Sequence, residues 1–187
     1  NALATLAYDG RRSEFFRNEL LLALNILEEG HIAPSEMKGS WAGAMGQNQF
    51  MPSSFNRLAV DGNGDGKRDI WNSLPDVFAS TANYLSKSGW KDEERWGREV
   101  KLPQGFPADV IGLETSKTLE VWQKMGVKLP GGQDIPVVDG MSASVVAPDG
   151  VNGLAYLVYD NYRVIMKWNK STYFATSVGL LADAIAN

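Results

Sequence analysis

The sequence predicts an α+β protein that is mainly helical, with a small antiparallel β element near the C-terminus. Two observations favour this class. Apolar residues recur at helical spacing early in the chain, in its middle and at its end. β-Branched and aromatic residues gather in one late stretch, 143–168, where a Pro-Asp-Gly turn interrupts them. We therefore expect helices to dominate, with strands shortly before the last helix.

The first predicted helix lies within residues 11–30, after an Asp9-Gly10 turn. Gly30 stands where helices commonly end in a left-handed residue. The apolar face follows from the three- and four-residue spacing of Phe16, Leu20, Ala23, Leu24 and Leu27.

The second helix is predicted over residues 73–89. Ser73 and Asp76 resemble a capping box, Pro75 suits the first turn, and Gly89 suits the end. A Gly-rich, weakly periodic stretch separates the two helices. Its side chains are more typical of a cleft lining than of a regular helix.

The C-terminal half is expected to form a smaller, mixed part. A helix over 116–125 is followed by two or three antiparallel strands within 143–168. The last helix is predicted from the spacing of Phe174, Val178, Leu181 and Ile185. We thus expect a core portion over 1–90, a small mixed lobe with a β-hairpin over 91–168, and a C-terminal helix over 169–187 that returns to the core.

Composition argues against several classes of function. Lys and Arg total 18 against 22 Asp and Glu, and no basic stripe is interleaved with aromatics, so nucleic acid is not an expected partner. The chain has no cysteine, which excludes disulfides and thiolate chemistry. A single histidine, His31, does not support a zinc site or a serine triad. We expect no organic cofactor.

The stretch DGNGDGKRD, residues 61–69, predicts a metal-binding loop. Ca²⁺ prefers several oxygen ligands, and an EF-hand loop supplies them at alternate positions around a central glycine. The matching ligands are Asp61, Asn63, Asp65, the Lys67 carbonyl and Asp69. Asn72 replaces the usual bidentate Glu, so Na⁺ is an alternative ion. We expect the EF-hand-like loop 61–72 to be structural; the other interpretation is a solvated turn without a metal.

The segment KGSWAGAMGQNQFMPSSF, residues 38–55, carries the functional signal. The amides of Gln47, Asn48 and Gln49 suit hydroxyl and acetamido groups, and Trp41 suits a sugar face. Composition therefore predicts a sugar or peptide cleft here.

This segment, joined to VDGNGDGKRDIWNS and ASTANYLSKSGW, resembles the membrane-bound lytic transglycosylase B family of peptidoglycan-cleaving enzymes. The opening NALATLAYDGRRSEFF and the late WNKSTYF are also similar to that family, so the resemblance covers nearly the whole chain. It implies a lysozyme-like core, with peptidoglycan glycan strands and stem peptides as partners. It also implies the periplasm, or the inner face of the outer membrane, of a Gram-negative bacterium.

The resemblance further implies lytic cleavage between MurNAc and GlcNAc by a single Glu acid/base, forming 1,6-anhydro-MurNAc. The family's Val-Glu motif is absent, so we expect this acid upstream of Asn1, in an N-terminal portion of the same enzyme. We name no catalytic residue, because Glu36 has only its proximity to the cleft segment in its favour. Solvated positions are expected for Glu14, Glu19, Glu28 and Glu29. The alternative function is a non-catalytic peptidoglycan-binding or scaffold protein with the same groove.

Positions that match the family imply a set of substrate-binding residues. The set is Ser40, Gln49, Phe50, Met51, Tyr84, Asn169, Arg11 and Arg12. Ser40 would contact the muramoyl sugar near the reacting centre, and Gln49 would contact an acetamido group or help to orient the acid. The Arg pair would meet stem-peptide carboxylates. Structural alternatives exist for all of them: a turn hydrogen bond for Ser40, a structural amide for Gln49, solvation for the Arg pair, a helix cap for Asn169, and core packing for Phe50, Met51 and Tyr84.

Overall fold

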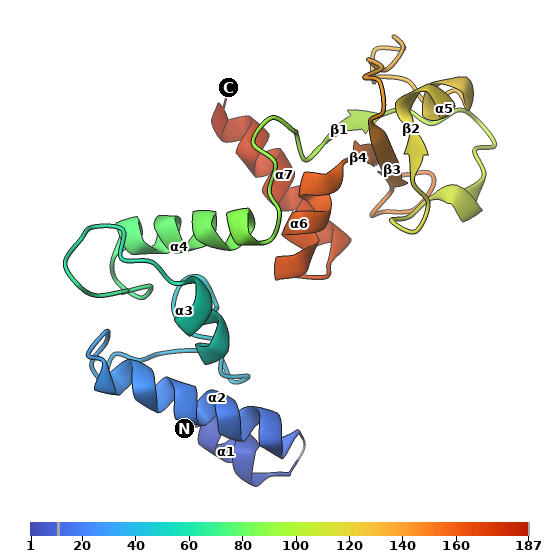
Figure 1. The fold of residues 1–187 in the computed structure, drawn as a ribbon. Helices are drawn as coiled ribbons and strands as arrows, with labels where there is room; N and C mark the ends of the chain where they lie inside the picture. Colours follow the sequence, from blue (N-terminus) through green and yellow to red (C-terminus); the bar gives the residue numbers. More distant parts are fainter. Residues whose placement is uncertain (11, 187) are drawn as a thin grey trace. The chain divides into compact units, whose positions relative to one another are not determined.

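The computed structural model describes residues 1–10 and 12–186, so Arg11 lies outside the described residues (Figure 1). The chain groups into two compact units, Asn1–Lys87 and Ser88–Asn187. The predicted return of the C-terminal helix to the first unit stays a prediction. Within the described ranges, no helix has both the length and the apolar character needed to cross a membrane.

The first unit contains two of the helices that periodicity predicts. The helices are α1 (Ala2–Tyr8), α2 (Ser13–Glu28), α3 (Pro52–Leu58) and α4 (Leu74–Lys87). The predictions for 11–30 and 73–89 are confirmed by α2 and α4. Gly30 and Gly89 follow these helices with φ of 75° and 98°, as helix-ending glycines do.

Two helices of this unit, α1 and α3, were not predicted from the sequence, and each spans 7 residues. A helix of two turns is too short for an apolar stripe to repeat, so periodicity carries little signal. α3 begins with Pro52, which is favoured in the first helical turn, and it buries Phe55 and Leu58. Packing against α2 and α4 therefore stabilises α3.

The predicted capping box at the start of α4 is wrong. Asp76 is fully buried, and its carboxylate accepts the backbone N–H groups of Gly62 at 2.9 Å and Asp69 at 2.7 Å. The N–H of Ser73 instead donates to the carbonyl of Asp69. Asp76 thus ties both ends of the acidic loop to α4.

The second unit is built around a four-stranded antiparallel sheet in the order β1-β4-β3-β2. The strands are β1 (Gly97–Val100), β2 (Lys117–Thr118), β3 (Ser142–Val146) and β4 (Ala155–Val158). A 3₁₀ turn, η1 (Ala108–Val110), lies between β1 and β2. The predicted small antiparallel element is therefore confirmed, and β1 and β2 are strands that sequence reasoning did not find.

Both faces of this sheet are covered. Val145 and Leu157 pack with Trp122 of α5 (Leu119–Lys124) in one core cluster. Val146 and Tyr156 pack in another, which also contains residues of α6 (Asp160–Trp168) and α7 (Thr172–Ala186). Burial on both faces explains why every residue of β4 is apolar and buried, and why β3 is buried at four consecutive positions, from Ala143 to Val146, instead of at every second one.

Two sequence predictions for this unit need correction. The stretch after Tyr159 is the helix α6 and not a further strand. Its buried residues follow helical spacing, with Tyr162 and Ile165 three positions apart on the face that enters the core. The helix predicted over 116–125 is shorter because Lys117 and Thr118 pair with β3. The last predicted helix is confirmed by α7.

Candidate functional site

Residues 38–51, which precede α3 and are called the cleft segment below, fold into a compact set of turns and not into a regular helix or strand. Met45 and Phe50 exchange backbone hydrogen bonds of 2.7 and 3.0 Å, which close a tight turn between them. Gly46 in this turn has a φ of 61°, and a Cβ there would lie 2.7 Å from both a side-chain carbon and the carbonyl oxygen of Ile70. Only glycine avoids this clash, so the turn depends on that position.

Gln49 has an unusual backbone conformation at the end of the turn. Its φ is 52°, a left-handed value that few residues other than glycine adopt. Its side-chain Nε2 donates to the carbonyl of Gly46 at 2.8 Å, and the residue is exposed. Such conformations cluster at functional sites, where the surrounding structure holds them. Gln49 is therefore placed at the surface in a defined orientation.

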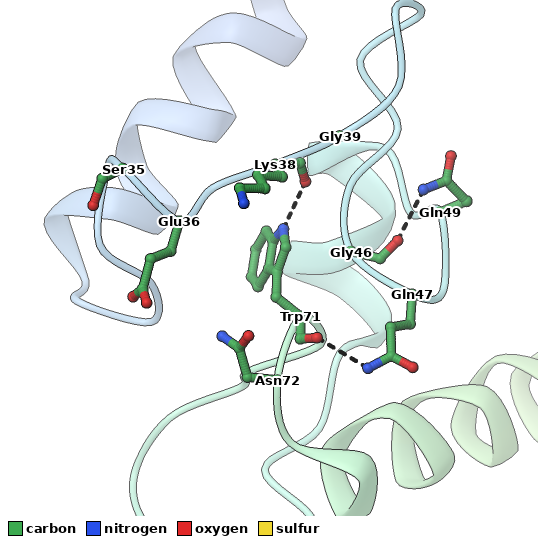
Figure 2. Close-up of a pocket in the computed structure, with 9 residues that line it drawn as sticks. All are labelled: Ser35, Glu36, Lys38, Gly39, Gly46, Gln47, Gln49, Trp71 and Asn72. Carbon is green, nitrogen blue, oxygen red and sulfur yellow. Dashed lines mark hydrogen bonds between the residues drawn. The ribbon is translucent and has the colours of Figure 1, made fainter.

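Two hollows flank this segment within the first unit. The polar hollow has a volume of about 440 Å³ and is shown in Figure 2. Its lining residues are Ser35, Glu36, Lys38, Gly39, Gly46, Gln47, Gln49, Trp71 and Asn72. The indole Nε1 of Trp71 donates to the carbonyl of Lys38 at 2.8 Å, which fixes the ring (Figure 2). Sequence reasoning did not propose Trp71 for a site, because it stands next to the acidic loop and not in the cleft segment.

The apolar hollow, of about 420 Å³, contains Ser40 on its wall. Its other walls come largely from α1, from α2 and from the methionines Met37 and Met45. The Ser40 hydroxyl accepts the N–H of Ala44 at 3.2 Å, so the turn hydrogen bond that was the structural alternative is present. The hydroxyl proton is still available to a ligand.

Other predicted cleft residues lie deeper. Phe50 is only 3% exposed, and its ring centroid lies 5.9 Å from that of Tyr84. Met51 is the half-buried N-cap residue of α3. Asn48 is also buried and donates to the Val77 carbonyl and the Thr81 hydroxyl of α4, so the prediction that its amide faces a sugar is wrong. Trp41, by contrast, is 83% exposed.

The remaining predicted contacts are separate from this cluster in the chain. Arg12 is exposed, has a φ of 56°, and lies with its guanidinium 4.5 Å from the centre of the Phe15 ring. Asn169 is an exposed residue of the second unit that follows α6. It does not cap α7 with its side chain; the hydroxyl of Ser171 accepts the N–H of Phe174 instead. Substrate binding by all of the predicted residues stays a prediction.

The prediction that Glu19 is solvated is wrong. Glu19 is 3% exposed, and its carboxylate accepts the N–H of Ser53 at 2.9 Å and the hydroxyl of Ser53 at 2.6 Å. It therefore caps the start of α3, directly after the cleft segment. Glu29 is half of an ion pair with Arg68, at 2.8 Å. Glu36 is exposed and lines the polar hollow.

The acidic loop is organised by its own carboxylates. Asp61 accepts N–H groups from Gly64 at 2.7 Å and Gly66 at 2.8 Å. The Gly66 hydrogen bond is the main reason why the pKa of Asp61 is lowered from 3.8, an effect that partial desolvation opposes. Asp65 accepts the N–H of Lys67 at 2.8 Å. Among residues 1–10 and 12–186, no three acidic, histidine or cysteine side chains are gathered as a metal cluster.

The donor chemistry of this loop nevertheless suits a hard cation. Asp61, Asp65 and Asn63 present side-chain oxygens from one turn, and Gly64 and Gly66 adopt φ of 79° and 86°, which allow its tight path. The Nδ2 of Asn72 donates to the Asp69 carboxylate, so Asn72 orients a residue that the sequence predicts as a ligand.

Comparison with known proteins identifies the family. The model of the transglycosylase SLT domain matches residues 1–183. The chain belongs to the transglycosylase SLT domain family. It is 33% identical over 193 residues to membrane-bound lytic murein transglycosylase B of Escherichia coli K12, an alignment that covers 100% of this chain and 50% of the relative.

Solved structures of SLT-domain transglycosylases are similar along nearly the whole chain. SltB3 of Pseudomonas aeruginosa in complex with NAG-NAM-pentapeptide has a TM-score of 0.92 and 51% identity, over 100% of this chain and 50% of that one. Escherichia coli Slt35 in complex with calcium has a TM-score of 0.82 and 33% identity, over 99% and 58%. The lysozyme-like fold of the lytic transglycosylases is thus confirmed. The chain spans about half the length of the curated relative that it matches.

Proposed function

We propose that this chain carries the glycan-binding groove of a peptidoglycan lytic transglycosylase. The observation that carries the proposal is the cleft segment 38–51, which contributes Ser40 to the apolar hollow and holds Gln49 in a left-handed conformation at the polar hollow. An exposed amide in a fixed orientation suits an acetamido group, and the exposed Trp41 suits a sugar face. Similarity to SltB3, whose crystal structure contains a disaccharide-pentapeptide, supports the same substrate class.

The proposed reaction breaks the bond between C1 of MurNAc and the oxygen of the adjoining GlcNAc. A glutamic acid protonates that oxygen as the bond breaks, and the resulting carboxylate then takes the proton of the MurNAc 6-hydroxyl, whose oxygen attacks C1. The product is 1,6-anhydro-MurNAc, and no water is consumed. The glutamate returns to its protonated form, so one residue completes the cycle.

We propose that this glutamate is contributed by a segment N-terminal to the groove. Glu19 caps α3 and Glu29 pairs with Arg68, so their carboxylates are already engaged. Glu36 is exposed, whereas an acid that must be protonated near neutral pH needs apolar surroundings. The engagement of these glutamates favours a second candidate, in which the chain binds peptidoglycan without cutting it. A periplasmic location is part of the proposal in either case.

Digestion of isolated sacculi, with mass detection of the products, tests the activity. We expect a polypeptide that contains this chain and its N-terminal segment to release anhydromuropeptides, and the 187-residue chain to bind sacculi without release. Gln49→Ala should weaken sacculus binding, and Gln104→Ala, an exposed amide of the second unit, is the matched control. Release of hydrated muropeptides would contradict the lytic reaction. Equal binding by both variants would contradict the groove assignment.

We also propose that the acidic loop binds Ca²⁺ as a structural ion. The ligands would be Asp61, Asn63, Asp65, the carbonyl of Lys67 and Asp69. Slt35, a relative with 33% identity, was crystallised in complex with calcium, which supports this assignment. Calorimetric titration of the chain with Ca²⁺, Na⁺ and Mg²⁺ tests it. Binding of Ca²⁺ that Asp65→Asn weakens supports the proposal, and no heat with any of the ions overturns it.

A further inference from the structure

The polar hollow that Gln49 lines contains three side-chain amides whose nitrogen atoms already donate hydrogen bonds within the protein. The Nε2 of Gln47 donates to the Trp71 carbonyl at 2.9 Å, and that of Gln49 donates to the Gly46 carbonyl at 2.8 Å (Figure 2). The Nδ2 of Asn72 donates to the Asp69 carboxylate at 3.2 Å. All three amide nitrogens thus donate hydrogen bonds to other groups of the protein. The three amide oxygens are left to accept hydrogen bonds from a ligand.

Two opposite charges complete the rim of the hollow. Glu36 and Lys38 are both exposed, and in the part of the chain that the structure describes neither belongs to an ion pair. In Figure 2 Glu36 and Asn72 lie on one side of the Trp71 ring, and Gln47 and Gln49 lie on the other. The hollow therefore offers a carboxylate and amide oxygens to a donor, and one ammonium to an anion.

Trp71 supplies an apolar surface between these polar groups. Its ring is held by the bond from Nε1 to the Lys38 carbonyl and by the Phe55 ring, whose centroid lies 5.7 Å away. A fixed indole can pack against an alkyl chain and attracts a cation placed over its face. A ligand that fits this hollow has a short alkyl chain that ends in both an ammonium and a carboxylate.

We propose that the polar hollow binds the free, zwitterionic end of a diamino-acid side chain in the stem peptide. The ammonium would lie against Glu36 and the amide oxygen of Asn72, which are on the same side of the indole, the carboxylate against Lys38, and the alkyl chain against Trp71. This inference rests on the proposed function, because it names the peptide that accompanies the glycan in the groove. Cross-linking converts that ammonium into a neutral amide, so the hollow selects strands whose stem peptides are not cross-linked.

NMR titration of the 187-residue chain with three probes tests this selection. The probes are GlcNAc-anhydro-MurNAc without peptide, the same disaccharide with a stem peptide that ends in the free diamino acid, and that muropeptide acetylated at the side-chain amine. We expect the free-amine probe to bind about five- to tenfold more tightly than the acetylated one, since a charge-assisted contact is lost on acetylation. Glu36→Gln should abolish this difference. Glu28→Gln, which changes an exposed glutamate of α2, should retain it.

The outcomes separate this inference from the proposed function. Equal affinity for the free and acetylated muropeptides, with binding of the disaccharide intact, overturns the inference and leaves the groove assignment standing. A difference that persists in Glu36→Gln also overturns it. Failure of every probe to bind overturns both. Chemical shift changes at Trp71 and Asn72 that only the free-amine probe produces support the inference.

Discussion

Removal of the Glu19 carboxylate should destabilise α3 and the end of the cleft segment. The carboxylate makes two hydrogen bonds to Ser53, one to its N–H and one to its hydroxyl, and Glu19 is 3% exposed. A hydrogen bond to a charged group contributes about 1.5–3 kcal/mol to stability. Because the two bonds share one carboxylate, their losses are not fully additive. We expect Glu19→Ala to reduce the free energy of opening of α3 by about 2–4 kcal/mol.

Hydrogen exchange measured by NMR gives this free energy locally. The amides of Phe55 and Ala59 donate to the carbonyls of Met51 and Phe55 within α3, so their protection reports the opening of the helix. Ser53→Ala removes only the hydroxyl bond and should cost about 1–2 kcal/mol. In the double variant the two losses should fall short of their sum, because each single change breaks the same hydroxyl bond.

The matched control is Glu28→Ala, which removes an exposed carboxylate from the same helix. An exposed change of this kind is expected to alter stability by less than about 0.5 kcal/mol. A loss in Glu19→Ala no larger than that in Glu28→Ala would refute the argument. So would strict additivity with Ser53→Ala, because it would mean that the two side chains do not interact.

Three further predictions concern the second unit and the acidic loop. A Cβ at position 179 would lie 2.3 Å from the Trp96 ring. Gly179→Ala should therefore lower the free energy of unfolding of the second unit by about 1–2 kcal/mol, because this steric clash costs more than the gain in helix propensity. Urea unfolding measures the change, and an unchanged transition midpoint would contradict the prediction. Burial is the main cause that raises the pKa of Tyr156 and of Tyr162 above 10.0 in the folded protein. As the pH rises, these tyrosines therefore lose their protons in the unfolded chain before they do so in the folded one. The free energy of unfolding should fall as the pH rises above about 10. Ultraviolet titration of tyrosinate should therefore show late-titrating groups, and their absence would contradict the assigned burial. The Asp76 carboxylate accepts the N–H groups of Gly62 and Asp69, near the two ends of the acidic loop. Asp76→Ala should therefore weaken Ca²⁺ binding, measured by calorimetry, by about tenfold or more. Unchanged affinity would contradict this, because it would show that the loop keeps its shape without Asp76.

The sequence determined the features whose signals are local. The helices α2, α4 and α7 were predictable because each repeats an apolar face over several turns, and a glycine marks the end of α2 and of α4. The acidic loop was visible because its residues alternate at fixed spacing. The cleft segment was visible because its composition is unusual and its motif resembles a known family.

Only the tertiary structure decided which polar side chains leave the solvent. Glu19 and Asn48 look like surface residues in the sequence, yet each is buried because a backbone group distant in the chain needs its hydrogen bond. Asp76 likewise serves the acidic loop and not its own helix. The polar hollow also depends on a hydrogen bond between distant segments, because the Gln47 side chain donates to the carbonyl of Trp71, 24 residues further along the chain. Local pattern determines the period of an element, whereas burial and hydrogen-bond partners are set by whichever segments the fold packs against it.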